Sequence, residues 1–373
     1  MPHLSRSTIV LVAWQLLAAA TVDAGPITKY QGLCDASAAV ALGAELFVVG
    51  DNDHNVLKIY RRDQPTATAC IDLRDYLARR QASGKPAETR SGRGGGAATP
   101  ACDPREDFGT SGAKAKEADI EGAARIGNRI YWIASHGRNS KGKFREERQR
   151  FFATDVRETP SGTTLTVPPT PPYTQLVVAL VADRRFAPLA EAYAQEKGPE
   201  KAGGFNIEGL AATPAGHLLI GFRNPLTLKG EALLVPLTNP AAVIDTAAQP
   251  IFGDLLALDL GGRGIRSIES VGQGFVIVAG PIGNKSKQAG KDFALYEWSG
   301  KAGDRPQKKA DIDFAKFGPE ALFFFPGNDQ PYVLSDDGDE KIDGIACKDD
   351  RVPMARKTFR GFYLDAARSV INR

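Results

Sequence analysis

Five acidic residues recur along the chain in one local setting, and their type suits metal or acid–base chemistry. A small residue and a short apolar run follow each of Asp35, Glu121, Glu208, Glu269 and Glu320. If these runs are equivalent strands of a repeated unit, the five carboxylates converge at one end of it. Converging carboxylates repel unless their pKa values rise, or arginines, backbone amides or a cation compensate. Oxygen ligands with few histidines nearby suit a hard ion such as Ca²⁺ or Mg²⁺.

Three further polar residues follow the second apolar run of two repeats. His136 and Arg138 come after the run 130–133, and Arg223 comes after the run 218–220. The arginines can pair with the acids, or they can clamp a carboxylate or phosphate of a ligand. His136 can act as a general acid or base, or it can be an incidental loop residue. We therefore take His136, Arg138 and Arg223 as candidates for a catalytic role.

Two classes of function fit this set of residues. In the first, the five acids with Arg138 and Arg223 form an acidic, arginine-flanked mouth that binds a small ligand, a cation or a protein partner. In the second, Glu121 and Glu208 hold divalent metal that activates water for hydrolysis of a phosphoester, ester or lactone. A structural alternative is that each acid hydrogen-bonds backbone amides of the neighbouring unit. The GxSxG, HExxH, P-loop and GxGxxG motifs are absent from the sequence.

Short strands are the elements that must position these residues. The 373 residues include 39 glycines and 24 prolines, which favours many turns over long helices. The acidic positions 35, 121, 208, 269 and 320 are 86, 87, 61 and 51 residues apart. A blade of four short strands needs about 40 to 50 residues. The spacing predicts an all-β protein, a β-propeller of five blades, with six blades or an irregular β-sandwich as alternatives.

The long intervals between the first repeats must contain insertions. A Gly-, Ala-, Ser- and Pro-rich stretch at about 83–118 predicts a long loop insertion. The stretch 186–197 places Leu189, Ala190 and Tyr193 among charged residues, which predicts a short surface helix. We expect residues 25–373 to form a single domain.

The first 24 residues have the features of a secretory signal peptide. His3 and Arg6 precede an apolar run over 9–22, and a small-residue cleavage pattern ends at Ala24. An uncleaved anchor is the alternative, but the run is shorter than the roughly 20 apolar residues of a membrane span. No later stretch predicts a transmembrane segment. The net charge of +3 also makes nucleic acid an unlikely partner, so we expect a periplasmic or secreted protein.

Four cysteines remain after the expected cleavage, and an even number in an exported chain favours disulfides. We expect Cys34 to pair with Cys347, which would join the two ends of the fold, and Cys70 to pair with Cys102. Spacing alone does not exclude the other pairings or free buried thiols.

Several segments in chain order resemble a known family. They are residues 34–39, 119–124, 131–138, 205–210, 264–269 and 335–338. Together they resemble a bacterial family of exported proteins that is described only as a domain of unknown function, of β-propeller type. The Glu-Gly-Leu pattern at 208–210 is also distantly similar to exported propellers that include esterase-like phytase domains. The resemblance implies a propeller and, at most, a metal-assisted hydrolase, and it transfers no catalytic residue.

Overall fold

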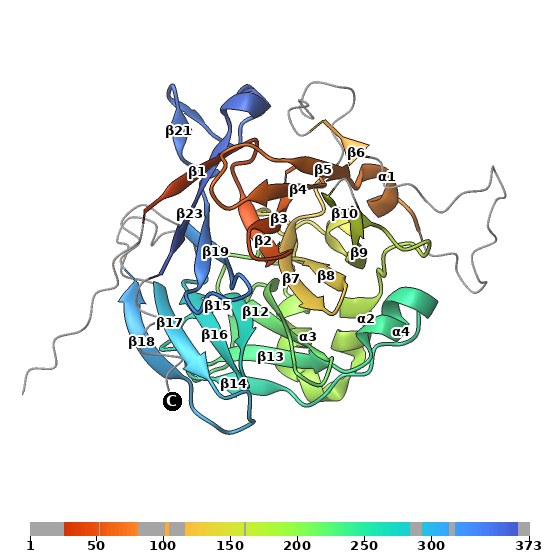
Figure 1. Cartoon of the computed structure of the whole chain (residues 1–373). Helices are drawn as coiled ribbons and strands as arrows, with labels where there is room; N and C mark the ends of the chain where they lie inside the picture. Colours follow the sequence, from red (N-terminus) through yellow and green to blue (C-terminus); the bar gives the residue numbers. More distant parts are fainter. Residues whose placement is uncertain are drawn as a thin grey trace, which may run out of the picture.

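Five antiparallel sheets form the protein in the computed structural model, which describes residues 26–51, 53–80, 101–103, 116–159, 162–283, 293–312 and 318–364. The innermost strands of the sheets are β2, β7, β11, β15 and β19. Each contacts the next, and β19 contacts β2, so the strands close a ring around one axis. Figure 1 shows this ring with the sheets radiating from it. The prediction of five blades is confirmed, and the alternatives of six blades and a sandwich are not.

The first four blades are built in chain order from the axis outward. Blade 1 is β2 (Ala36–Ala41), β3 (Leu46–Asp51), β4 (Val56–Arg61), β5 (Ala69–Asp72) and β6 (Ala101–Cys102). Blade 2 is β7 (Ile120–Ile126), β8 (Arg129–Ala134), β9 (Phe151–Thr159) and β10 (Gly162–Thr166). Blade 3 is β11 (Asn206–Ala212), β12 (Leu218–Leu226), β13 (Ala232–Leu237) and β14 (Leu256–Leu258). Blade 4 is β15 (Gly264–Val271), β16 (Gly274–Gly280), β17 (Phe293–Trp298) and β18 (Gln307–Ile312).

The fifth blade joins the two ends of the chain. It consists of β19 (Gly318–Phe323), β20 (Tyr332–Asp336), β23 (Thr358–Tyr363) and, outermost, the N-terminal strand β1 (Thr28–Gln31). In Figure 1 the red β1 lies beside the blue β23. The register runs from Thr28 opposite Gly361 to Gln31 opposite Thr358. A small hairpin, β21 (Lys341–Ile342) and β22 (Ile345–Ala346), is inserted between β20 and β23.

Both predicted disulfides are confirmed. Cys34 is bonded to Cys347 and Cys70 to Cys102. The first bond joins the segment just before β2 to the segment just after the inserted hairpin. It therefore reinforces the junction of the chain ends that β1 and β23 make.

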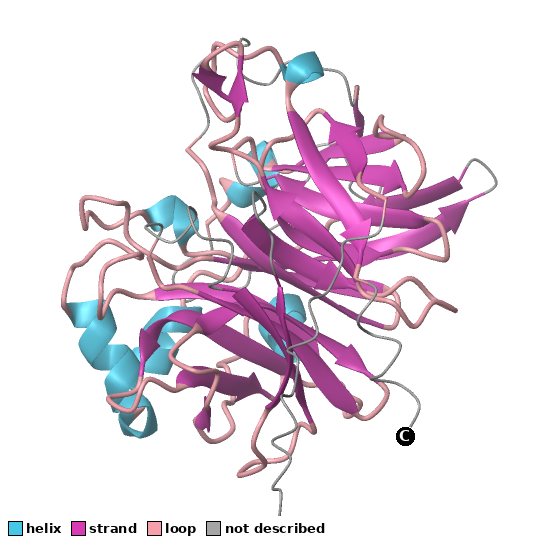
Figure 2. Cartoon of the chain, turned by 90° about the vertical axis from the view of Figure 1, so that its left-hand side faces the viewer, coloured by secondary structure: helices cyan, strands magenta, loops and turns pink. Residues whose placement is uncertain are grey.

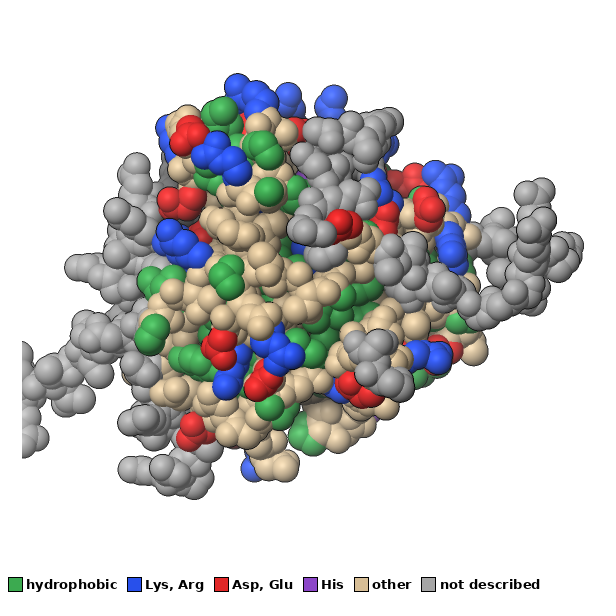
Figure 3. Space-filling model, turned by 45° about the horizontal axis from the view of Figure 1, so that its top comes forward, with side chains coloured by type: hydrophobic (Ala, Val, Ile, Leu, Met, Phe, Trp, Pro, Cys, Tyr) green, Lys and Arg blue, Asp and Glu red, His purple; other side chains and the backbone are tan. Residues whose placement is uncertain are grey.

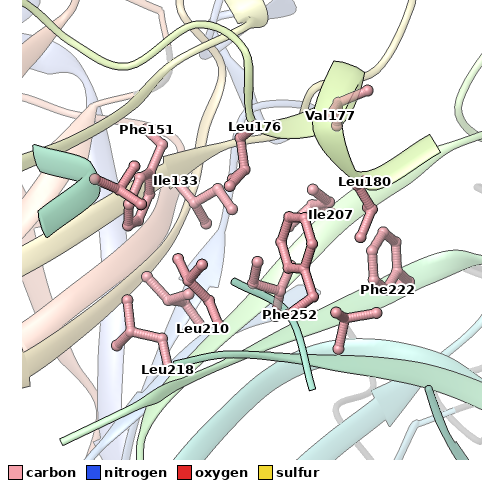
Figure 4. Packing of buried hydrophobic residues seen from close by; sticks show 14 of the residues in the cluster. Ile133, Phe151, Leu176, Val177, Leu180, Ile207, Leu210, Leu218, Phe222 and Phe252 are labelled. Atoms are coloured by element: carbon pink, nitrogen blue, oxygen red, sulfur yellow. The ribbon is translucent and has the colours of Figure 1, made fainter. Parts of the chain in front are cut away.

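The hydrophobic core lies between adjacent blades, because both faces of each inner strand are covered by a neighbouring sheet. The largest cluster joins blades 2 and 3 and includes Phe151, Ile207, Leu210 and Phe222. Figure 4 shows these residues facing Leu180 and its neighbours from a flanking helix.

The helices are short and peripheral, and Figure 2 shows most of them at one edge of the molecule. They are α1 (Arg74–Leu77), α2 (Leu176–Ala182), α3 (Ala187–Ala194) and α4 (Pro240–Thr246), with 3₁₀ turns η1 (Glu146–Arg148), η2 (Arg184–Phe186) and η4 (Met354–Arg356). Helix α3 confirms the predicted surface helix, and its buried residues Leu189 and Ala192 attach it to the cluster between blades 2 and 3.

Two predicted segments fall outside the described residues. They are the signal peptide at 1–24 and most of the insertion at 83–118. In the part of the chain that the structure describes, no helix is long and apolar enough to cross a membrane. On the face shown in Figure 3, basic and acidic side chains lie close together at several places.

Candidate functional site

Every inner strand carries a β-bulge near its start. The strand register shifts at the second or third residue of each strand, between Ile120 and Gly122 in β7, for example. A bulge redirects the extra side chain away from the ladder. The five bulge residues are Ser37, Glu121, Glu208, Arg266 and Glu320. The bulges therefore direct one polar side chain from each blade to the same end of the propeller.

A small residue follows each bulge because the axis is crowded there. A Cβ on Gly122 would lie 2.9 Å from Cγ2 of Ile133, and one on Gly209 would lie 2.8 Å from Cγ2 of Ile265. Alanine or serine occupies the equivalent position in the other three blades. This packing explains why an Ile-Glu-Gly pattern marks the inner strands of two blades.

Glu269 is not part of this arrangement, which corrects the sequence prediction. Arg266 occupies the bulge of blade 4, and Glu269 lies three residues further along β15, opposite Val276. The backbone amide of Ser270 donates to Glu269 over 3.1 Å, and burial raises the pKa of this carboxyl to about 8. The prediction failed because residues 265–267 and 268–270 both read as Ile, a charged residue and Ser.

The bulges and the loops above them surround a cavity of about 580 Å³. Ten carboxylates and five basic side chains line it. The acids are Asp35, Asp53, Glu117, Asp119, Glu121, Glu200, Glu208, Glu320, Asp336 and Asp339, and the bases are Arg145, Arg148, Lys201, Arg223 and Lys348. Below it, small and apolar residues of all five inner strands leave a space of only about 10 Å³. The cavity is thus the mouth of the central channel, which is closed at its inner end.

Three carboxylates converge on one wall of this cavity. One oxygen each from Asp35, Glu320 and Asp336 lies within 4.8 Å of the others. Oγ of Ser37 lies 2.7 Å from Oδ1 of Asp35 and 3.0 Å from Oε2 of Glu320, so its one proton can go to either carboxylate. A hard cation is bound by oxygen ligands of this kind. Asp35 therefore joins the ring as predicted, from two residues before the bulge.

Glu208 is paired with two arginines, and its predicted role as a metal ligand stays a prediction. Its Oε1 accepts from Nη1 of Arg223 at 2.8 Å and from Nδ2 of Asn206 at 2.7 Å. Nε of Arg266 lies 3.1 Å from Oε2, an ion-pair contact that is not aligned as a hydrogen bond. Arg266 is only 3% exposed and also pairs with Glu320. These contacts give Glu208 a structural role.

Glu121 is in the opposite situation. It lines the cavity, and no described residue forms an ion pair or hydrogen bond with its carboxylate. Burial raises its pKa well above the usual value, and the charges of Asp119, Glu208 and Asp35 raise it further. The guanidinium of Arg266 opposes this shift only in part. Glu121 thus lines the cavity without a partner among the described residues, and its role as a ligand-binding residue stays a prediction.

Sequence reasoning missed two residues of the site, Asp119 and Asn206. Asp119 lines the cavity beside Glu121, and Nη1 of Arg148 lies 2.8 Å from its Oδ2. Asn206 is 3% exposed, and its Oδ1 is buried with no hydrogen-bond partner among the described residues. The available signal was positional: Asp35, Asp119 and Asn206 each stand two residues before a bulge.

Residues 153–317 match the model of a family described as a protein of unknown function, DUF3616. This confirms the resemblance to a family of unknown function. The matched segment spans blades 3 and 4 and most of the two outer strands of blade 2.

Several solved structures are weakly similar to the chain. Glutaminyl cyclase from Myxococcus xanthus is 11% identical, with 93% of this chain and 97% of that chain covered and a TM-score of 0.40. The PQQ-bound aldose sugar dehydrogenase from Streptomyces coelicolor is 9% identical, with 91% and 99% covered and a TM-score of 0.38. No curated protein matches the chain.

The catalytic candidates His136 and Arg138 are not among the residues that line the cavity. His136 is fully buried with a φ of 52°, and its Nδ1 lies 2.8 Å from the carbonyl oxygen of Ala134. Burial lowers its pKa to about 4, so the ring is neutral at physiological pH. Arg138 pairs with Glu196 at 3.1 Å. Of the three candidates, only Arg223 lines the cavity, and it holds Glu208.

A second group of metal-ligand type lies at the rim. Asp51, Asp53 and His54 place one ligand atom each within 4.8 Å of one another. Nδ1 of His54 lies 3.0 Å from Oδ2 of Asp51, and the backbone amide of Asp53 donates to Oδ1 of Asp51. The three residues are therefore held together by contacts within one turn, without a cation. Burial and the charge of Asp51 raise the pKa of Asp53 to about 6.

Proposed function

We propose that the protein is an exported propeller that binds a divalent cation, Ca²⁺ or Mg²⁺, at the mouth of its channel. The observation that carries this proposal is the convergence of the Asp35, Glu320 and Asp336 oxygens within 4.8 Å. Three carboxylates at this spacing are a donor set for a hard cation. Export is supported by the leader pattern and by two disulfides, which persist in oxidising compartments.

Two further oxygens of the cavity support the same ligand. The buried Oδ1 of Asn206 has no partner among the described residues, and an unpaired buried acceptor is costly. The Glu121 carboxyl has a raised pKa because acids crowd it. A bound cation would lower the repulsion that raises this pKa. The cation therefore compensates the excess of acids in the cavity.

The basic residues of the cavity support a small molecule as a second ligand beside the cation. Arg145, Lys201 and Lys348 line the cavity with the acids. Cationic side chains next to a metal ion suit an anionic or zwitterionic ligand whose oxygens reach both. A bound cation would in this way recruit the ligand.

Hydrolysis is the second candidate function, and Glu121 is the observation that favours it. A buried carboxyl group with a raised pKa can donate a proton to a leaving group. A cation beside it would polarise an ester or phosphate oxygen. Assays of a phosphoester, a carboxylic ester and a lactone, each with Ca²⁺ and with chelator, separate this function from simple binding.

Thermal unfolding with Ca²⁺, Mg²⁺ and a chelator tests the proposal. A ligand at 100 times its Kd stabilises the native state by about 2.7 kcal/mol, a shift of a few degrees. We expect this shift in the parent protein. We expect its loss in the Asp35→Asn, Asp336→Asn double variant, in which the shape of both side chains is kept.

Glu269→Gln is the matched control, because Glu269 is an acid of the inner strand β15 that does not line the cavity. This variant should keep the full shift. An equal shift in the parent and in the double variant would contradict the proposed ligands. The absence of any shift in the parent would refute cation binding.

A further inference from the structure

A second cavity, of about 650 Å³, lies at the opposite end of blade 4. The turn between β15 and β16 and the loop between β17 and β18 form its walls, at residues 271–275 and 297–307. The first cavity adjoins the start of β15, where Arg266 forms the bulge, whereas this one adjoins its end at Val271. The two cavities therefore open on opposite faces of the propeller.

Two neighbouring residues bring unpaired polar atoms to this cavity. Trp298 is 3% exposed, and its Nε1 has no hydrogen-bond partner among the described residues. Oε1 of Glu297 is likewise buried and unpaired, while its Oε2 pairs with Lys309. An unpaired buried donor or acceptor costs about 1–3 kcal/mol. Side chains of consecutive strand residues point to opposite faces, so the donor and the acceptor call for two separate groups of a ligand.

The remaining wall is aromatic and nearly neutral. The rings of Phe275 and Trp298 are 5.5 Å apart and tilted by 31°. The loop packs directly on Phe275 at Gly300, where a Cβ would lie 2.7 Å from the ring. Asp304 accepts from the hydroxyl of Ser299 at 2.6 Å. Arg305 is the single basic residue of the lining, so two acids and one base face the cavity.

Hydroxyl groups suit both unpaired atoms, because one hydroxyl can accept from Nε1 of Trp298 and another can donate to Oε1 of Glu297. Gln273 and Gln307 also line the cavity, and their amides can serve further hydroxyls in the same two ways. The aromatic wall suits the C–H face of a ring. We infer that this cavity is a second ligand site, which binds a small, uncharged, polyhydroxylated molecule of the saccharide class.

Calorimetric titration of the full chain with glucose, galactose, N-acetylglucosamine and cellobiose tests this site. We expect saturable binding of at least one of these sugars. Trp298→Phe keeps an aromatic ring on Phe275 and removes only the Nε1 donor. Loss of one hydrogen bond of about 1 kcal/mol should weaken binding about fivefold.

Trp132→Phe is the control, because the Nε1 of Trp132 donates to Thr154 inside blade 2. It should bind the sugar as the parent does. If Trp298→Phe does not fold, Gln273→Ala in the exposed turn replaces it and should weaken binding to a similar extent. No binding of any of the four sugars by the parent would overturn the inference. Equal affinity in the parent and in a folded Trp298→Phe or Gln273→Ala variant would also overturn it.

Discussion

At the residue scale, two glutamates of the same local sequence have opposite roles. Glu121 and Glu208 both occupy a bulge and both precede glycine. Arg223 and Arg266 neutralise Glu208, whereas no described residue pairs with Glu121. The difference arises from blade 4, whose bulge residue is an arginine that reaches Glu208 and not Glu121. Only the unpaired acid remains available for a ligand.

The raised pKa of Glu121 makes the stability of the protein depend on pH. The native state holds this proton at a pH where the unfolded chain has released it, so stability falls as pH rises above the unfolded pKa of about 4.3. Glu121→Gln removes this loss. We expect the variant to be more stable than the parent by about 1–2 kcal/mol at pH 8 and equal to it near pH 4.

Urea unfolding in chelator from pH 4 to pH 8 measures this difference. Glu269→Gln should behave in the same way, because the pKa of Glu269 is raised to about 8. The two variants should differ in the thermal shift that a divalent cation causes, because Glu121 lines the cavity and Glu269 does not. Parallel stability curves for Glu121→Gln and the parent would show that Glu121 is ionised in the native state.

At the element scale, the bulge is the feature that builds the site. An unbulged inner strand would alternate its side chains regularly between the two faces of the sheet. The extra residue breaks this alternation and turns one polar side chain to the mouth. Arg266 shows the result, because it links Glu208 of blade 3 to Glu320 of blade 5 across the axis.

Removal of this link should destabilise the propeller. Arg266→Met leaves the carboxylates of Glu208 and Glu320 without the guanidinium that they share. Loss of one partner of a buried ion pair costs about 3–5 kcal/mol. Glu320→Gln in the same chain should restore part of this loss. Urea unfolding at pH 7 gives both values.

Arg157→Met is the control, because Arg157 is exposed on β9 and should change stability by less than about 0.5 kcal/mol. A similarly small change in Arg266→Met would mean that the link contributes little to the fold.

At the scale of the whole molecule, closure of the ring joins residues from the two ends of the sequence. Strand β1 completes the fifth blade, and Tyr30 at its centre contacts Tyr332 with a hydroxyl distance of 2.7 Å. The Cys34–Cys347 bond spans 313 residues in sequence, and the Cys70–Cys102 bond spans 32. A longer closed loop restricts the unfolded chain more strongly.

Replacement of each cysteine pair by serine should therefore have unequal effects. Loss of the Cys34–Cys347 bond should lower the free energy of unfolding by about 2–5 kcal/mol, and loss of the Cys70–Cys102 bond by less. Denaturant unfolding of the two double variants under oxidising conditions measures both. Equal losses would show that loop length does not determine the contribution of these disulfides.

The sequence by itself determined the architecture. Apolar runs such as Leu46–Val49 and Ile130–Ile133, each bounded by turn residues, are sufficient to specify short strands and blades. The surface helix also followed from local pattern, whereas spacing left the disulfide pairing open and the structure decided it. The positions of Asp35, Glu121, Glu208 and Glu320 near the channel mouth followed from the repeat, because equivalent strands place equivalent residues at one end.

The tertiary structure alone decided which of these residues are free to act. The register of β15 is set by its packing on β11 and β19, so the sequence 265–270 did not reveal that Arg266 and not Glu269 faces the axis. The pairing of Glu208 depends on Arg223 and on this same Arg266. The left-handed backbone of His136 turns its ring into the core. In each case the deciding contact comes from a neighbouring strand or from backbone geometry, which a local sequence pattern does not contain.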